Sequence, residues 1–395
     1  MNLNKEIKIA IISHFTFKEE EKAEVFPGNI RNFLLRKIEK VIYIDHPFIQ
    51  SQHVSSDFLG SQLRIYDHGV KTYQLTSPKI ELPILILFTY QLFLTIFYML
   101  RKFVKYDVCI ACDNLSLISV FILRKVGLIK KLVYYTVDYS SIRYTNSLLN
   151  NLYQQMDRLA SMISDVNWVT VENMITAKVQ NGLDLKRCAP FQVVPIGFNK
   201  EEIFIKPTDK VNRFHLVFVG FLFEKQGLQL MIKVLPKLIK KFPNIRLTII
   251  GSGPFEKQIR ESVELYNLNS YVRFTGYVNN HQEIVELLTD RGGIGLATYI
   301  PSIGDYTYNA DPSKIKLYLL CGLPVITTKV PPIAKEIARR KAGFAINYEE
   351  KELISALEQL LGDDKIYASF RKNALNMAKT YDTNIILNKA FKELA

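Results

Sequence analysis

Three segments in the second half of the chain combine residue types that can bind an anion. In "DPSK", Asp311 is a preferred helix N-cap and Pro312 suits the first helical position, which places Ser313 and Lys314 in the first turn. Free backbone N–H groups and the positive end of the helix dipole gather at such a start. A lysine there adds like charge to the helix end, so its presence indicates a bound anion. An ordinary solvated lysine is the alternative.

The other two segments are glycine turns that follow apolar, strand-like runs. In "LVFVGFLFEKQG" (216–227), Gly220 follows the run and Lys225 lies in the loop ahead of a predicted helix. Glycine lets a phosphate approach the backbone, and Lys225 can supply a positive charge. "TIIGSGPFEK" (248–257) repeats the strand–glycine–helix order, with a tight turn without ligand as the alternative. The three segments together predict a phosphate site.

Short β-rich runs alternate with helix-length segments along the whole chain. The runs are 7–13, 40–44, 107–111, 132–137, 215–219, 245–250, 271–275, 294–297 and 325–328. Such alternation predicts an α/β protein with parallel sheets covered on both faces. Residues 193–213 contain prolines, a glycine and mixed charges, as domain junctions do. We therefore predict two tandem Rossmann-like, doubly wound domains, 1–199 and 200–380, with ligands where the strands' carboxyl ends face a cleft.

Composition and charge narrow the class of partner. The 395 residues are 48% hydrophobic and 23% charged, which suits two globular domains. The net charge of +13 is spread evenly, with no basic tail or arginine-rich stripe, so a nucleic-acid partner is not expected. A diffuse positive field suits anionic partners such as sugar nucleotides, phospholipid headgroups and lipid-linked phosphates.

The sequence contains none of the usual motifs for metal binding or for nicotinamide cofactors. Cys109 and Cys112 form a CxxC, but they lie in an apolar run and no second CxxC or histidine pair completes a zinc set. They are expected to be core thiols. The six histidines form no HxxxH or HExxH pattern, so no metal site is predicted. The absence of GxGxxG after the first strand of either domain argues against a dehydrogenase.

An apolar stretch at 82–100 is long enough to span a bilayer. Strands that belong to one sheet lie on both sides of it, so a crossing would separate them. We predict that it does not span. It is either a buried core helix or a helix that lies in the membrane surface near Lys102 and Lys105. The N-terminus runs directly into a strand without a secretory signal, so we expect a cytoplasmic protein, peripheral on the inner membrane face.

The ordered set "VPIGFN", "FVGFLFEKQG", "IIGSGP", "VRFTGYV", "PSKIKLYLLCGLPVI" and "GFAI" resembles the C-terminal half of a GT-B glycosyltransferase. It is similar to the large nucleotide-sugar-dependent family that includes bacterial polysaccharide and lipid-linked sugar transferases. The resemblance covers 190–380 well and the N-terminal half more loosely. It implies a donor held mainly by the second domain and an acceptor held by the first. It also implies a helix within 381–395 that crosses back to the first domain.

The resemblance implies donor-binding positions. Lys225 lies near the family's donor-phosphate lysine, although Gln226 occupies the slot where that lysine often sits. Gly220 belongs to the same turn. Tyr277 and Val278, in "TGYV", match the turn whose backbone meets the nucleobase.

One departure from the family pattern concerns its two glutamates, which are eight positions apart. The slots hold Asn309 and Leu317 here, so the carboxylate that contacts ribose is absent. The phosphate-binding helix start is kept as Ser313 and Lys314. Ribose recognition and the choice of base are therefore in doubt, and the family's retention of anomeric configuration is only weakly implied.

On the acceptor side, "FPGNIRNFL" resembles the family's loop that faces the sugar, here with Gly28 and Asn29, and a plain helix start is the alternative. Asp138 follows "LVYYTV", where relatives carry a histidine or an acid pointing into the cleft. It can take the acceptor hydroxyl's proton or stabilise positive charge on the sugar, and a turn cap is the alternative. Asp113 and His14 follow other strands and are further candidates. Trp168 is expected in the core.

The resulting prediction is a glycosyltransferase that moves a sugar from a nucleoside diphosphate sugar to a hydroxyl of a lipid-linked or polysaccharide acceptor. Lys225, Lys314 and the helix start would neutralise the departing diphosphate, so neither a metal nor another cofactor is expected. Two alternatives remain open. One is a GT-B-like subunit that no longer catalyses and binds a partner transferase or glycan, and the other is a sugar-nucleotide epimerase on the same fold.

Overall fold

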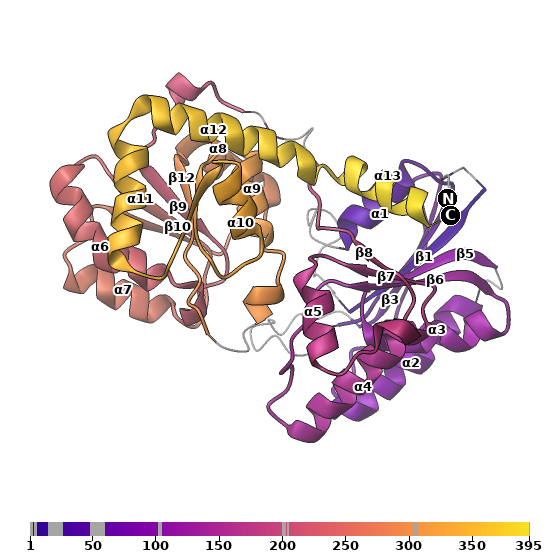
Figure 1. The fold of residues 1–395 in the computed structure, drawn as a ribbon. Coiled ribbons are helices and arrows are strands. Elements are labelled where there is room, and N and C mark those ends of the chain that lie inside the picture. The colour runs from indigo at the N-terminus through magenta and orange to yellow at the C-terminus, as the bar shows by residue number, and fades with distance from the viewer. Residues whose placement is uncertain are drawn as a thin grey trace. The chain divides into compact units, whose positions relative to one another are not determined.

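The computed structural model describes residues 6–14, 27–47, 60–101, 105–199, 205–302 and 306–394, together with Leu3 and Ile203. The chain forms two compact units. The first consists of Met1–Gly197 and Thr383–Ala395, and the second of Phe198–Asp382. Figure 1 shows a sheet with flanking helices in each unit. Lys102, proposed beside the apolar stretch, lies outside the described residues.

The sheet of the first unit has eight strands in the order β4-β3-β2-β1-β5-β6-β7-β8. These are β1 (Lys8–Ser13), β2 (Lys40–Asp45), β3 (Gln62–Asp67), β4 (Val70–Thr76), β5 (Tyr106–Ala111), β6 (Ile129–Thr136), β7 (Val166–Val169) and β8 (Phe191–Val193). All pairings from β2 through β8 are parallel, as predicted. The carboxyl ends of β1, β5 and β6 therefore meet at one edge.

The prediction of a parallel sheet is wrong at the other edge, where β3 and β4 are antiparallel. They are joined by a two-residue turn, His68 and Gly69, with φ of 50° and 79°. Two consecutive left-handed residues form the hairpin turn whose twist matches that of the strands. Sequence inspection missed it because the usual Asn-Gly signal is replaced by His-Gly.

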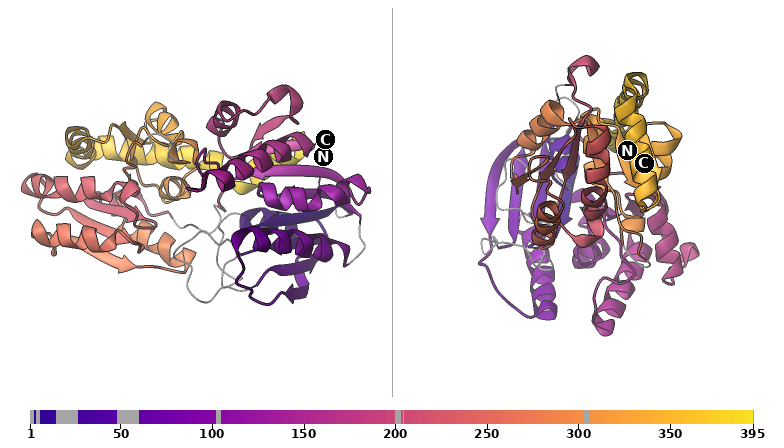
Figure 2. Two further views of the ribbon diagram at one scale, coloured as in Figure 1. Left: turned by 90° about the horizontal axis from the view of Figure 1, so that it is seen from below. Right: turned by 90° about the vertical axis from the view of Figure 1, so that its left-hand side faces the viewer.

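Helices cover both faces of this sheet (Figures 1 and 2). They are α1 (Gly28–Leu35), α2 (Ile84–Leu100), α3 (Asn114–Lys125), α4 (Ser147–Ile163), α5 (Asn173–Gln180) and α13 (Thr383–Glu393). The C-terminal helix α13 packs on α1, with the Phe391 ring 6.0 Å from that of Phe33. Trp168 is fully buried against Phe391 and Tyr135, which confirms that it is a core residue.

The apolar helix α2 is buried on one side and exposed on the other. Leu87, Tyr98 and Met99 are buried. Four large apolar side chains on the same helix are 49–64% exposed: Leu85, Ile86, Phe93 and Phe97. Within the described ranges, no helix combines the length and hydrophobicity needed to cross a bilayer.

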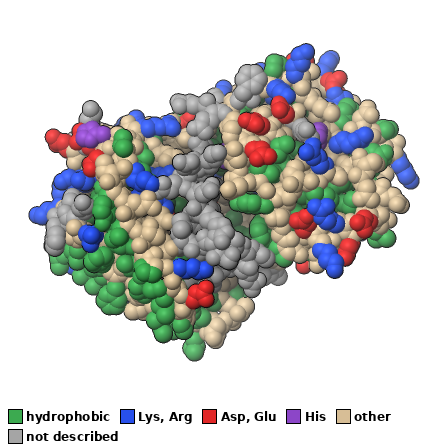
Figure 3. Space-filling view, turned by 180° about the vertical axis from the view of Figure 1, so that it is seen from behind, with side chains coloured by type: hydrophobic (Ala, Val, Ile, Leu, Met, Phe, Trp, Pro, Cys, Tyr) green, Lys and Arg blue, Asp and Glu red, His purple; other side chains and the backbone are tan. Residues whose placement is uncertain are grey.

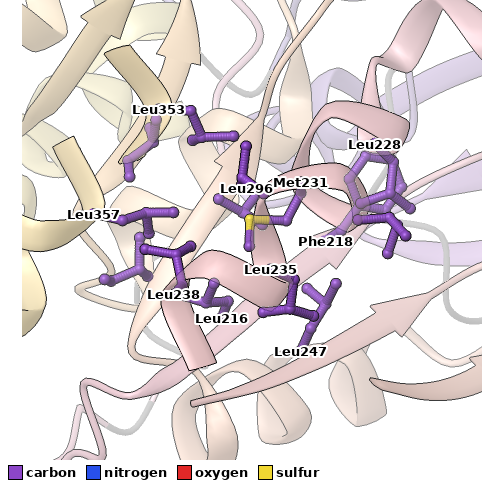
Figure 4. Packing of buried hydrophobic residues seen from close by; sticks show 14 of the residues in the cluster. Leu216, Phe218, Leu228, Met231, Leu235, Leu238, Leu247, Leu296, Leu353 and Leu357 are labelled. Carbon is purple, nitrogen blue, oxygen red and sulfur yellow. The ribbon is translucent and has the colours of Figure 1, made fainter. Parts of the chain in front are cut away.

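The second unit is a six-stranded parallel sheet in the order β11-β10-β9-β12-β13-β14. Its strands are β9 (His215–Val219), β10 (Arg246–Ile250), β11 (Val272–Gly276), β12 (Ile294–Ala297), β13 (Val325–Thr328) and β14 (Gly343–Ile346). Its helices are α6 (Leu228–Lys241), α7 (Glu256–Leu265), α8 (His281–Arg291), α9 (Ser313–Leu320), α10 (Ile333–Arg339), α11 (Glu350–Gly362) and α12 (Asp364–Ala378). Figure 4 shows leucines of α6 and α11 packed on strand residues such as Leu216 and Phe218.

A buried ion pair supports the core of the first unit. Lys178 Nζ lies 2.6 Å from Asp157 Oδ1, and the two side chains are 0% and 1% exposed. The Tyr134 hydroxyl donates to the same carboxylate oxygen at 2.6 Å. Burial lowers the pKa of Lys178, while Asp157 opposes that shift. Each charge therefore depends on the other to remain inside.

Replacing Asp157 with asparagine preserves the side-chain shape but leaves the Lys178 ammonium without its counter-charge. We expect D157N to lower the free energy of unfolding of the first unit by about 3–5 kcal/mol. Urea unfolding followed by tryptophan fluorescence measures this directly, because Trp168, the single tryptophan of the chain, lies in this core. Asp67→Asn is the matched control, since its pair with Lys40 is exposed and 3.9 Å long. Equal losses in both variants would contradict the prediction.

Candidate functional site

In the second unit, the turns after β9 and β10 pack backbone to backbone. Gly220 and Gly251 have φ of 135° and 133°. A Cβ added to Gly251 would lie 2.1 Å from the Gly220 carbonyl oxygen. Only glycine fits this approach.

The helix start that follows differs from the prediction. α9 begins at Ser313 with Pro312 as its N-cap, and no side chain caps it. The predicted N-cap, Asp311, is instead a partner of Lys316, whose side chain is 0% exposed. The prediction was wrong because a buried ammonium competes more strongly for the carboxylate than exposed backbone N–H groups do. The free N–H groups of the first turn remain available.

Lys314 lies beside this turn. Its Nζ donates to Gln226 Oε1 at 2.5 Å and lies 4.1 Å from the centre of the Phe218 ring. A Cβ built on Gly220 would be 3.2 Å from that ammonium nitrogen. Loss of hydration lowers the pKa of Lys314 to about 7. The structure therefore brings Lys314, from the start of α9, into contact with Gly220 and Gln226, from the segment after β9.

The other predicted donor residues surround the same sheet edge or its loops. Lys225 Nζ lies 3.8 Å from the centre of the Tyr306 ring. Tyr277 is 70% exposed directly after β11, followed by Val278, and can stack on a planar ligand. Asn309 ends a short 3-10 turn (Tyr306–Asn309) and Ser313 is exposed at the start of α9.

Leu317 occupies the second of the two glutamate positions of the family pattern, and its side chain faces the interior. Leu317 is 5% exposed and packs in the core between α9 and the sheet. No carboxylate therefore comes from this position.

The first unit contains a pocket, open to solvent, at the carboxyl ends of β1, β5 and β6. Apolar side chains form much of its wall, among them Phe88 of α2 and Leu149, Leu152 and Met156 of α4. His14, Asp113, Asp138 and Arg143 are polar residues of its lining. The pocket is therefore amphipathic.

His14 and Asp113 are in direct contact in this pocket. His14 Nδ1 lies 2.8 Å from Asp113 Oδ2 and 3.1 Å from Ser116 Oγ. Asp113 Oδ1 caps α3 by accepting the Ser116 N–H at 2.8 Å. Burial alone would raise the pKa of Asp113, but His14 and the Ser116 hydrogen bonds outweigh burial and lower it. Among the described residues, the buried His14 Nε2 has no hydrogen-bond partner.

Asp138 is exposed, and its Oδ2 accepts a hydrogen bond from Arg143 at 3.0 Å. No sequence pattern points to Arg143, because a lone arginine in a loop is ordinary before its neighbours are known. Gly28 and Asn29 begin α1, and the Asn29 amide donates to the Gly197 carbonyl at 3.2 Å. That amide has a structural partner, and its sugar-binding role stays a prediction.

Cys109 and Cys112 are buried free thiols, as expected. In the part of the chain that the structure describes, no three or more His, Cys, Asp or Glu residues gather closely enough to hold a metal ion.

Comparisons with known families and with solved structures both find similarity to glycosyltransferases. Residues 199–377 match the family model described as "Glycosyl transferases group 1". Sucrose-phosphate synthase from Thermosynechococcus elongatus superposes with a TM-score of 0.70, at 15% identity over 98% of this chain and 99% of its own. Anabaena HepE, solved with UDP-glucose, gives 0.67 at 16% identity, with the same coverage. These likenesses show that the chain has the GT-B fold.

Two curated relatives share 23–24% sequence identity with this chain. The gpi3 subunit of Schizosaccharomyces pombe phosphatidylinositol N-acetylglucosaminyltransferase is 24% identical over 352 residues, 85% of this chain and 70% of the relative. A putative colanic acid biosynthesis glycosyltransferase of Escherichia coli is 23% identical over 245 residues, 61% of this chain. The match spans only 57% of that relative's length.

The lowered pKa of Lys314 predicts a pH-dependent nucleotide affinity. A bound diphosphate favours the charged ammonium, but the free protein loses that proton as the pH rises through about 7. We expect the affinity for UDP to fall between pH 7 and 9, by up to about tenfold per pH unit. Isothermal titration calorimetry measures this. The phosphate is already ionised over this range.

Lys314→Met should bind UDP more weakly at pH 7 and lose the pH dependence. Lys257→Met, which removes an exposed lysine of the same unit, is the control. A pH dependence that persists in K314M would assign it to another group.

Proposed function

We propose that this chain, whose residues 199–377 match the model described as "Glycosyl transferases group 1", transfers a sugar from a nucleoside diphosphate sugar to the hydroxyl of an acceptor. The second unit holds the donor and the first unit holds the acceptor. The acceptor is a lipid-linked or polysaccharide intermediate. The protein acts at the inner face of a membrane.

The observation that carries the proposal is the environment of Lys314. Two fully buried lysines, Lys178 and Lys316, each have a carboxylate partner, whereas Lys314 is partly buried. Among the described residues Lys314 forms no ion pair, and its hydrogen bond goes to the neutral amide of Gln226. A cation held out of water with a neutral partner is stabilised when an anion binds beside it.

A diphosphate meets this requirement. Its oxygens can accept hydrogen bonds from Lys314 and from the free N–H groups at the start of α9. These groups stabilise the negative charge that develops on the diphosphate as the bond to the sugar breaks. Lys225, on the turn after β9, is the proposed second cation. We propose that these cations replace a divalent metal.

The acceptor assignment is supported by the amphipathic pocket of the first unit. Its apolar wall suits the chain of a lipid, and its polar residues suit a hydroxylated headgroup. The names of two relatives support a lipid or polysaccharide acceptor. One is named for phosphatidylinositol, and the other is named for colanic acid biosynthesis.

Contact with a membrane surface is supported by α2. Leu85, Ile86, Phe93 and Phe97 are exposed on this helix, and Phe88 of the same helix lines the pocket. Figure 3 shows hydrophobic side chains gathered on the lower part of the first unit, where Figure 1 places α2. A lipid bound in the pocket would therefore emerge beside an apolar surface.

The first test is a thermal-shift panel of UDP, GDP, ADP, CMP and dTDP, with and without EDTA. One nucleotide at about 100 times its dissociation constant should stabilise the protein by roughly 2.7 kcal/mol, which raises the melting temperature by a few degrees. EDTA should not change the shift. If no nucleotide stabilises the protein, the non-catalytic alternative is favoured. Conversion of the donor sugar without an acceptor would instead identify an epimerase.

The membrane contact is tested with vesicles of phosphatidylcholine and phosphatidylglycerol in a sedimentation assay. Leu85→Glu with Ile86→Glu should lower binding by more than about tenfold, because each apolar side chain contributes roughly 1.5–3 kcal/mol when buried. Leu265→Glu is the control, since this leucine is 74% exposed on α7 of the other unit. Equal vesicle binding by both variants would exclude α2 as the contact.

A further inference from the structure

We infer that the acceptor is a lipid whose hydrocarbon chain lies along the outward face of α4 and whose uncharged, hydroxylated head occupies the polar end of the pocket. The inference rests on the proposed transferase function. It narrows the acceptor from a lipid-linked or polysaccharide intermediate to one chemical class, and it gives α4 a binding role in addition to that of α2.

The two faces of α4 are inverted relative to an ordinary surface helix, which buries its apolar stripe and exposes polar residues. The buried residues of α4 are mostly polar or small: Gln154, Asp157, Ala160 and Ser161. In contrast, Leu148, Leu152 and Leu159 are 79%, 42% and 42% exposed. An apolar outward face indicates that an apolar partner covers it.

The apolar residues of α4 form one continuous stripe. With 3.6 residues per turn, Leu148, Leu152 and Leu159 lie within about 40° of one another around the helix axis. Leu149 and Met156 adjoin them and line the pocket together with Leu152. We call these five residues the α4 stripe. Because Leu152 is both exposed and part of the pocket lining, the stripe continues from the pocket to the outer surface.

No charge lies on the α4 stripe, because the two charged residues of the helix turn toward α5. Asp157 pairs with Lys178 of α5 at 2.6 Å. Arg158 Nη1 donates to the carbonyl of Asn181, at the end of α5, at 3.0 Å. These contacts fix the rotation of α4 about its axis, with the apolar stripe outward.

The polar end of the pocket is anchored to the same helix. Asp138 and Arg143 belong to the segment between β6 and α4, and both line the pocket. Asn150 Oδ1 accepts a hydrogen bond from the Arg143 N–H at 2.7 Å, and Gln154 Nε2 donates to the Ser140 carbonyl at 2.9 Å. The helix therefore holds a polar segment and an apolar stripe at a fixed spacing, which suits an amphiphile.

The charges of the lining favour an uncharged head. Arg143 Nη1 donates to Asp138 Oδ2 at 3.0 Å, and the other basic side chain of the described lining, His14, contacts Asp113. Each basic group of this lining thus already faces a carboxylate, so a phosphate would find no uncompensated cation there. Hydroxyl groups can donate to the carboxylates and accept from the guanidinium.

A hydrocarbon chain is the occupant that fits both parts of the stripe. Phe88 of α2 lines the same pocket, and Figure 1 shows α2 and α4 on the same side of the first unit's sheet. A lipid can therefore keep its chain against apolar side chains from the pocket to the exposed surface of α2. A polysaccharide is hydroxylated along its whole length and would leave the stripe without an apolar partner.

The chain requirement is tested with n-alkyl maltosides, which combine an uncharged, hydroxylated head with a chain of chosen length. Isothermal titration calorimetry with the octyl, decyl and dodecyl compounds is run below the concentrations at which they form micelles. We expect one site, with a Kd that falls by about fourfold per buried methylene, and no measurable binding of maltose. A Kd that does not depend on chain length would overturn the inference.

Leu152→Gln places an amide in the middle of the stripe while keeping a good helix former. It should weaken binding of dodecyl maltoside by more than about tenfold, without lowering the melting temperature. Leu185→Gln is the matched control, since this leucine is 49% exposed in the turn Leu185–Arg187 between α5 and β8. If Leu152→Gln destabilises the protein, Leu148→Gln, at the most exposed position of the stripe, replaces it. Equal binding by stripe and control variants would overturn the inference.

The head is tested with dodecyl phosphate, which carries the same chain as dodecyl maltoside. It should bind more weakly, because its charge meets the two carboxylates of the lining. Tighter binding of the phosphate would overturn the assignment of an uncharged head.

Other occupants of the stripe give different results. If Leu152→Gln lowers vesicle sedimentation but leaves maltoside binding unchanged, the stripe contacts the bilayer and the inference fails. If the variant instead abolishes self-association in analytical ultracentrifugation, with maltoside binding unchanged, a second copy of the chain covers the stripe.

These measurements use no nucleotide, so they separate the inference from the proposed function. Stabilisation by a nucleotide together with chain-independent maltoside binding would leave the transferase function intact and reject the lipid acceptor. Failure of the proposed function appears separately, as the absence of stabilisation by any nucleotide.

Discussion

The arrangement of this protein depends on one property of parallel sheets, which is that neighbouring strands end at the same edge. His14 follows β1, Asp113 follows β5 and Asp138 follows β6, so residues about 100 and 25 positions apart line one pocket. The second unit applies the same constraint to the turns after β9, β10 and β11. In both units the candidate site residues lie where strands end, while the helices pack on the sheets and hold those ends in place.

The lysines that lie away from solvent in this chain differ in whether a carboxylate balances their charge. Lys178 and Lys316 are enclosed and each is paired with an aspartate, so their charges are balanced inside the fold. Lys314 is held against aromatic rings and an amide, without a carboxylate among the described residues. A cation that is paired inside the fold has its charge already balanced. A cation without a carboxylate partner is stabilised when an anion binds beside it. This contrast supports the proposed donor site more strongly than the helix start alone does.

The same reasoning distinguishes the two carboxylates of the first unit. Asp113 is anchored by the start of α3, through the Ser116 N–H, and presents its other oxygen to His14. Asp138 is exposed beside Arg143. Two aspartates that look equivalent after their strands therefore have different surroundings, because Asp113 is held at a helix start and Asp138 is paired with Arg143.

The sequence by itself determined the α/β class, the parallel strands and the family resemblance, because these depend on local periodicity and on turns that require glycine. It also singled out Gly220, Ser313 and Lys314 for a predicted anion site. It missed the β3–β4 hairpin and misassigned Asp311, whose partner Lys316 is buried only after folding. Only the tertiary structure decided that His14 contacts Asp113 and that Lys314 meets Gln226. Such contacts join residues about 90–100 positions apart, and their chemistry depends on burial, which no local pattern encodes.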